Sequence, residues 1–173
     1  PYGMAFNNDG TKMYVIGSSG DDVNEYILTT GYDVSTASYV QSFYVGSQET
    51  VPTDVTFNND GTKMYVIGNT GDDVNEYSLS TAFDVSTASY VHNFSFASQE
   101  SGPRDITFNS DGTKMFIMGV TGDDINEYSL STAFDVSSAS FAGNSESVSV
   151  VSQESNPQGM SFHSDGTKMY VLG

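Results

Sequence analysis

Two aspartates followed three residues later by a glutamate recur along this sequence and are its most chemically suggestive feature. The members are Asp21, Asp22 and Glu25; Asp72, Asp73 and Glu76; and Asp123, Asp124 and Glu127. Hard cations such as Ca²⁺ take several carboxylate and carbonyl oxygens as ligands. One interpretation is therefore a Ca²⁺ site in each copy. The other, which we place first, is a solvated acidic loop that keeps a repetitive β protein soluble.

Catalytic side chains of other kinds are sparse. The chain has no Cys, which excludes disulfides and thiolate metal sites, and only two His, His92 and His163. Neither histidine lies in a pattern typical of Ser-His-Asp or Cys-His catalysis. Carboxylates can act as general acids and bases, but the same residues in every copy do not form one active site. The sequence alone predicts a protein that is not an enzyme.

An internal repeat dominates the organisation of the chain. Its copies open at Pro1, Pro52, Pro103 and Pro157, so the offset is 51 residues twice and then 54. The three extra residues fall between Phe141 and Val151, where an outer strand or loop would tolerate them. Because repeats of this length define the fold, we expect units at residues 1–51, 52–102, 103–156 and the start of a fourth at 157–173.

Each copy predicts four short strands. Apolar residues alternate in the first strand, as Val55 and Phe57 do, and an Asp-Gly pair such as Asp60-Gly61 then predicts a hairpin turn. This turn only faintly resembles a calcium loop, because the distal glutamate is missing. The second strand, such as KMYVIG at 63–68, is apolar on both faces. No segment has helical periodicity, so helix content should be near zero.

Four antiparallel strands per repeat of this length are typical of a β-propeller blade. The run DVTFNNDGTKMYVIG, with DVNEYSL after it, resembles the YVTN/NHL/lactonase-like family of propeller repeats. The resemblance implies a fold that hosts enzymes, receptors and scaffolds alike. Three copies and a part cannot close a ring. We therefore expect further copies of the repeat, or another chain, to complete it.

The expected meander also assigns charges to the two faces of the ring. In the second copy, one face should collect Asp54, Asp72, Asp73, Glu76 and Glu100, and the other Asp60, Asp84 and Lys63. Tyr26, Tyr77 and Tyr128 recur in register on the third strand. We expect core packing between blades there, with a sugar-binding ladder as the alternative.

The charge balance excludes some partners. With 22 acidic and 5 basic residues the net charge is −17, which disfavours nucleic acid and anionic membrane surfaces. No apolar run approaches the roughly 20 residues that span a bilayer, so membrane insertion is not expected.

The repetition and the missing catalytic set favour a binding, adhesion or structural module on a cell or virion surface, hence extracellular or on the virion. Its partners would be a protein or a glycan. The alternatives are a lactonase-like propeller hydrolase and a calcium-stabilised spacer or scaffold.

Calcium binding by the acidic loops predicts a salt-specific gain in stability. If Asp21, Asp22 and their counterparts bind Ca²⁺, millimolar CaCl₂ should raise the melting temperature by several degrees over EDTA, since a ligand that binds only the folded state stabilises it. Thermal unfolding followed by circular dichroism measures this shift, with MgCl₂ as the control. Equal shifts with both salts would mean charge screening, and no shift would remove the site.

Overall fold

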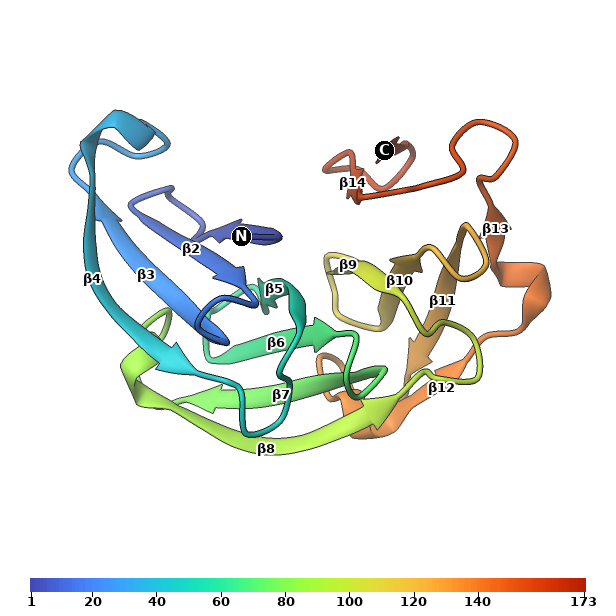
Figure 1. Cartoon of the computed structure of the whole chain (residues 1–173), viewed down its shortest axis with the longest axis horizontal. Coiled ribbons are helices and arrows are strands. Elements are labelled where there is room, and N and C mark those ends of the chain that lie inside the picture. The colour runs from blue at the N-terminus through green and yellow to red at the C-terminus, as the bar shows by residue number, and fades with distance from the viewer.

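The computed structural model describes all 173 residues as an open arc of antiparallel sheets (Figure 1). The first sheet contains β1 (Gly3–Phe6), β2 (Lys12–Gly17), β3 (Asp22–Leu28) and β4 (Ala37–Tyr44). The second contains β5 (Pro52–Phe57), β6 (Lys63–Gly68), β7 (Asp73–Leu79) and β8 (Ala88–Ser95). The third contains β9 (Pro103–Phe108), β10 (Lys114–Gly119), β11 (Asp124–Leu130), β12 (Ala139–Phe141) and β13 (Val148–Ser149). A hairpin of β14 (Gly159–Phe162) and β15 (Met169–Leu172) ends the chain.

The sheets are meanders in which each strand pairs with its sequence neighbours, so we call the first three blades 1, 2 and 3. The extra residues of the third copy break its outermost strand, and β13 pairs with β11 beside the short β12. The only helices are single 3₁₀ turns, none long or apolar enough to cross a membrane. They are η1 (Val34–Thr36), η2 (Val85–Thr87), η3 (Val136–Ser138) and η4 (Asn144–Glu146). The all-β prediction is confirmed.

The Asp-Gly pairs form the predicted hairpin turns. Gly61 has φ 72°, a left-handed conformation that costs a glycine little. The Oδ1 atom of Asp60 accepts hydrogen bonds from the backbone N–H of Thr62 at 2.9 Å and from its hydroxyl at 2.6 Å. The same contacts recur at Asp9, Asp111 and Asp165. These carboxylates therefore serve the turn itself.

Adjacent blades pack face to face through apolar side chains. Tyr14 and Ile16 of blade 1 join Val55, Met64 and Val66 of blade 2 in one buried cluster, and a second cluster joins blades 2 and 3. Two of the three third-strand tyrosines belong to these clusters as well: Tyr77 meets Phe43 edge to face at 5.5 Å, and Tyr128 meets Phe94 in the same way. These tyrosines are core residues, which favours packing over a sugar-binding ladder.

A buried glutamate in the middle strands adds a polar connection between blades. Glu25 is 2 % exposed, pairs with Lys12 at 2.8 Å and accepts the backbone N–H of Val85 from the next blade at 3.1 Å. Glu76 repeats the arrangement with Lys63 at 2.7 Å and Val136 N–H at 3.0 Å. A buried carboxylate is tolerated only when it is paired and hydrogen-bonded, and both conditions are met here.

A second glutamate joins each blade to the loop that follows. Glu49 is fully buried, and its carboxylate accepts the backbone N–H groups of Val51, Thr70 and Gly71 at 2.7–3.2 Å. Glu100 binds Gly102 and Thr121 in the same way. Each carboxylate thus fixes the β-turn between the second and third strands of the blade that follows it.

Removal of this carboxylate should destabilise the fold. Glu49→Ala leaves three backbone N–H groups without an acceptor, and we expect it to lower the free energy of unfolding by about 2–4 kcal/mol. Urea denaturation followed by circular dichroism measures the loss. The matched control is Glu154→Ala at the equivalent position, where the carboxylate accepts one backbone N–H, that of Asn156. Equal losses for the two variants would contradict the assigned role.

Candidate functional site

The first strands of the four repeats lie on the inside of the arc (Figure 1). Residues of all four line one concave space. Each of these strands lies at the end of its sheet and pairs on one edge only, so backbone groups of the other edge are left unpaired by the sheet. The space has a volume of about 910 Å³ and is lined mainly by residues of β1, β5, β9 and β14. It corresponds to the channel side of a propeller.

Two aspartates on neighbouring inner strands line this space. The Oδ2 atom of Asp54 on β5 accepts the backbone N–H of Ile106 on β9 at 3.1 Å. The Oδ2 atom of Asp105 on β9 accepts the backbone N–H of Met160 on β14 at 2.8 Å. Each carboxylate therefore satisfies a free edge-strand N–H of the next repeat, and the two carboxylates are placed side by side in the channel wall.

The positions that flank the two aspartates carry no side chain. The residue two places after the repeat proline is Gly3 in the first copy and Gly159 in the fourth. A Cβ atom at Gly3 would lie 2.4 Å from Asp54 Oδ1 and 2.7 Å from its Cα, so only glycine fits beside this carboxylate. The row Gly3, Asp54, Asp105, Gly159 thus concentrates two acids at one level of the channel.

Burial alters the acidity of both carboxyl groups. Removal from water raises the pKa of Asp54 well above its usual range, and the nearby charge of Asp105 raises it further. Burial also raises the pKa of Asp105, to about 6, against the opposing hydrogen bond from Met160 N–H. Because the groups interact, they titrate as a pair whose apparent pKa values are raised above the usual carboxyl range.

The rest of the lining mixes small hydroxyl groups and aromatic rings. Thr56, Thr107 and Ser161 lie two residues after the acidic row, and Phe108 and Phe162 also line the space. Its basic side chains are paired with acids: Lys114 contacts Glu127 at 2.8 Å, and His163 contacts Asp165 at 2.8 Å. Polar groups over an apolar wall are typical of small-molecule sites.

The paired aspartates of the sequence analysis lie in the loops between the second and third strands and at the start of the third. Asp21, Asp72 and Asp123 adopt left-handed backbone angles, with φ of 47–50°. One carboxylate oxygen of Asp21 and one of Asp72 are buried without a hydrogen-bond partner.

Burial raises the pKa of Asp72, and the charges of Glu100 and Glu49 raise it further. Asp73 and Asp124 instead accept side-chain amides of Asn75 and Asn126. Calcium binding here stays a prediction.

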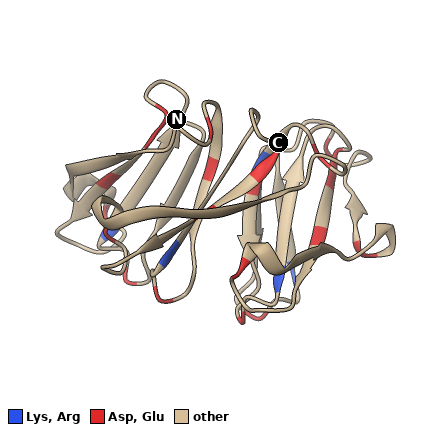
Figure 2. Ribbon diagram, turned by 90° about the horizontal axis from the view of Figure 1, so that it is seen from below, with Lys and Arg blue, Asp and Glu red and all other residues tan.

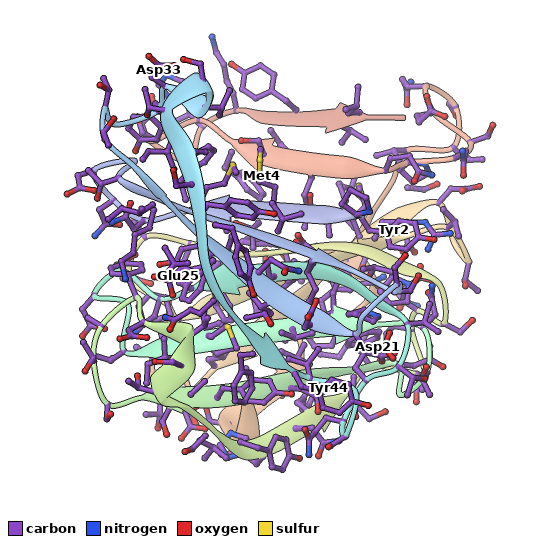
Figure 3. All side chains as sticks on the ribbon, turned by 60° about the vertical axis from the view of Figure 1, so that its left-hand side comes forward. Tyr2, Met4, Asp21, Glu25, Asp33 and Tyr44 are labelled. Atoms are coloured by element: carbon purple, nitrogen blue, oxygen red, sulfur yellow. The ribbon has the colours of Figure 1, made fainter.

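The glutamates of the same motifs lie elsewhere. Figure 3 shows Glu25 well separated from Asp21 along β3, and Glu25, Glu76 and Glu127 each pair with the lysine of their own blade. The expectation that Glu76 shares a face with Asp72 and Asp73, away from Lys63, is therefore wrong. Acidic residues occupy both ends of the sheets as well as the strands (Figure 2). Asp73 begins β7, whereas Glu76 lies three residues further along this strand, opposite Tyr65 of β6. The strand therefore carries Glu76 away from the loop that holds Asp72.

Comparisons with known proteins bear on the fold. No protein-family model matches the chain, and no curated protein matches it. A candidate 6-phosphogluconolactonase from Bacteroides uniformis superposes with a TM-score of 0.69 at 14 % identity, over 98 % of this chain and 46 % of the other. The periplasmic gluconolactonase of Pseudomonas aeruginosa gives a TM-score of 0.56 at 17 % identity, over 85 % of this chain and 39 % of the other.

The fold is that of a β-propeller. The likeness extends to propellers of other kinds, such as the Cps50 (Swd1) domain of Myceliophteria thermophila, with a TM-score of 0.62 at 10 % identity over 99 % of this chain and 49 % of the other. The chain spans less than half the length of the candidate lactonase. These likenesses confirm the predicted architecture, and any activity must be argued from the site itself.

The raised pKa of Asp105 predicts a pH-dependent cost to stability. Between about pH 4 and 6 the folded state holds a proton that the unfolded chain has released, so stability falls as the pH rises through this window. Asp105→Asn keeps an acceptor for Met160 N–H and removes the titration. We expect it to raise the free energy of unfolding by about 1–3 kcal/mol above pH 6.

Urea unfolding of both proteins from pH 4 to 8 measures the difference. The control is Asp111→Asn, because hydrogen bonds from Thr113 lower the pKa of that exposed turn carboxyl and it stays ionised throughout the upper part of the range. A wild-type to Asp105→Asn difference that does not change between pH 4 and 7 would contradict the assignment.

Proposed function

We propose that the concave space binds a small polar ring of the sugar-lactone class and that Asp54 and Asp105 hydrolyse it. The observation that carries the proposal is the interacting pair of carboxyl groups in the channel wall, flanked by glycines. The lactonase-like fold supports this choice of substrate class. The proposal replaces the binding module that we placed first from the sequence alone.

Hydrolysis of a lactone needs one group to accept a proton and one to donate a proton. In the proposed step, the carboxylate of Asp105 accepts a proton from water as the water oxygen forms a bond to the lactone carbonyl carbon. The bond from that carbon to the ring oxygen then breaks, and the carboxyl group of Asp54 donates a proton to this oxygen. The product is the open hydroxy acid. Asp54 suits the donor role because its pKa is raised by both burial and Asp105.

The remaining lining would bind the rest of the ring. The hydroxyl groups of Thr56, Thr107 and Ser161 can donate to and accept from sugar hydroxyls, and Phe108 and Phe162 offer apolar surface. Further copies of the repeat, or another chain, would complete the ring and enclose the space. The proposed hydrolase is therefore the closed ring.

A second candidate is the non-enzymatic binding module on a cell or virion surface. Its support is the exposed pair Tyr39–Val40 on β4 and its equivalent Tyr90–Val91 on β8, each side chain 43–57 % exposed. Repeated aromatic patches can bind a protein or glycan through avidity. This candidate places the function on the outer rim and leaves the channel carboxylates a structural role.

Initial rates of glucono-1,5-lactone opening, measured at constant pH against a buffer blank, test the hydrolase. We expect Asp54→Asn and Asp105→Asn each to lower the enzymatic rate by about 100-fold or more, since acid–base groups contribute about 10²–10⁴-fold. Glu146→Gln, an equal change of charge at an exposed site, should leave the rate unchanged. A wild-type rate no greater than the blank, together with glycan binding lost in Tyr39→Ser, would instead favour the binding module.

A further inference from the structure

The contact between blades 1 and 2 includes a side chain that donates to two carboxylates at once. The Nε2 atom of Gln41 on β4 lies 3.0 Å from Oε2 of Glu25 and 2.8 Å from Oδ1 of Asp84. Its amide carries two hydrogens, so each carboxylate receives one. Asp84 caps η2 of blade 2, and the glutamine therefore joins the two blades.

Between blades 2 and 3, His92 takes the place of this glutamine. Its Nε2 atom lies 3.2 Å from Oε2 of Glu76 and 3.4 Å from Oδ1 of Asp135, which caps η3 of blade 3. An imidazole nitrogen carries at most one hydrogen, so it cannot serve both carboxylates as the amide does. The backbone N–H of Ser137 lies 3.2 Å from Nε2 and also donates to Oδ1 of Asp135 at 3.0 Å. Compared with the junction between blades 1 and 2, this junction therefore lacks one side-chain hydrogen-bond donor.

The Glu76 oxygen that faces His92 accepts the backbone N–H of Val136 and has no lysine or arginine partner. Lys63 neutralises the other oxygen of Glu76 at 2.7 Å and donates to the carbonyl of Phe134 at 2.8 Å, so it does not reach the oxygen that faces His92. The side chain of Glu76 is 3 % exposed, whereas those of His92 and Asp135 are each 30 % exposed. A small ion can therefore enter from solvent and meet a buried carboxylate.

We infer that Glu76, His92 and Asp135 form a site for a divalent transition-metal ion of the zinc class that joins blades 2 and 3. The three ligand atoms all lie within 4.8 Å of one another. Tetrahedral zinc with ligands at about 2.0–2.1 Å has neighbouring ligands about 3.3 Å apart, close to the two measured separations. The imidazole ligand favours zinc, copper or nickel over calcium and magnesium, which prefer oxygen.

The three candidate ligands come from three different segments on two blades. Glu76 and His92 lie opposite each other on β7 and β8, and Asp135 comes from the next blade. A bound ion would take the place of the incomplete hydrogen bonding between His92 and the two carboxylates. It would form ligand bonds to residues of both blades. It should therefore stabilise the folded chain without any part in the chemistry of the channel.

Metal binding by the purified chain, stripped with EDTA and exchanged into metal-free buffer at neutral pH, tests the inference. Zinc is titrated by calorimetry, and cobalt is used as a probe because its visible absorption reports tetrahedral nitrogen and oxygen ligands. We expect one site per chain and a rise of several degrees in melting temperature at saturating zinc, but not with magnesium or calcium at equal concentration.

Three variants come from the repeat itself. His92→Gln copies the first junction and should lower the zinc affinity by about tenfold or more while keeping the fold, because it removes the nitrogen ligand. His163→Asn copies Asn109 and should bind zinc as the wild type does. Gln41→His should add a second site at Glu25 and Asp84. Zinc binding unchanged in His92→Gln, or no binding by the wild type at millimolar zinc, would overturn the inference.

Discussion

One interaction recurs at every contact between blades: a carboxylate of one repeat accepts a backbone N–H of the next. Glu25 bonds to Val85, Glu76 to Val136, Asp54 to Ile106 and Asp105 to Met160. Strand edges and the first residues of 3₁₀ turns must satisfy their N–H groups, and an anion is a strong acceptor. Several acidic residues of a chain with net charge −17 are thus internal connections, in addition to the charges that keep it soluble.

The same bond connects stability to the proposed chemistry. In the middle strands a lysine accompanies the carboxylate, so the charge is neutralised and stays structural. In the inner strands the partner of Asp54 and of Asp105 is a backbone amide without a cation, and burial raises the pKa of both groups. Burying these carboxyl groups raises their pKa values and lowers the free energy of unfolding. Such a loss of stability is common at catalytic sites.

The sequence predicted the architecture because periodicity and Asp-Gly turns are local signals. It placed Glu76 on the wrong face, because Glu76 lies three residues along β7 from Asp73 and pairs there with Lys63. The channel pair was missed although the signal existed: position two after each proline reads Gly, Asp, Asp, Gly. The contact of His92 with Asp135 joins positions 43 residues apart on two blades, which no local pattern contains.

The central claim is that Asp54 and Asp105 form an interacting pair whose carboxyl pKa values are raised by burial. The most direct measurement is a pH titration of their side-chain carboxyl ¹³C resonances by NMR, assigned with Asp54→Asn and Asp105→Asn. The account predicts two transitions shared by both resonances, one of them near pH 6 or above, and a single shifted transition in each variant. Independent titration of both groups near pH 4, as in exposed aspartates, would contradict it.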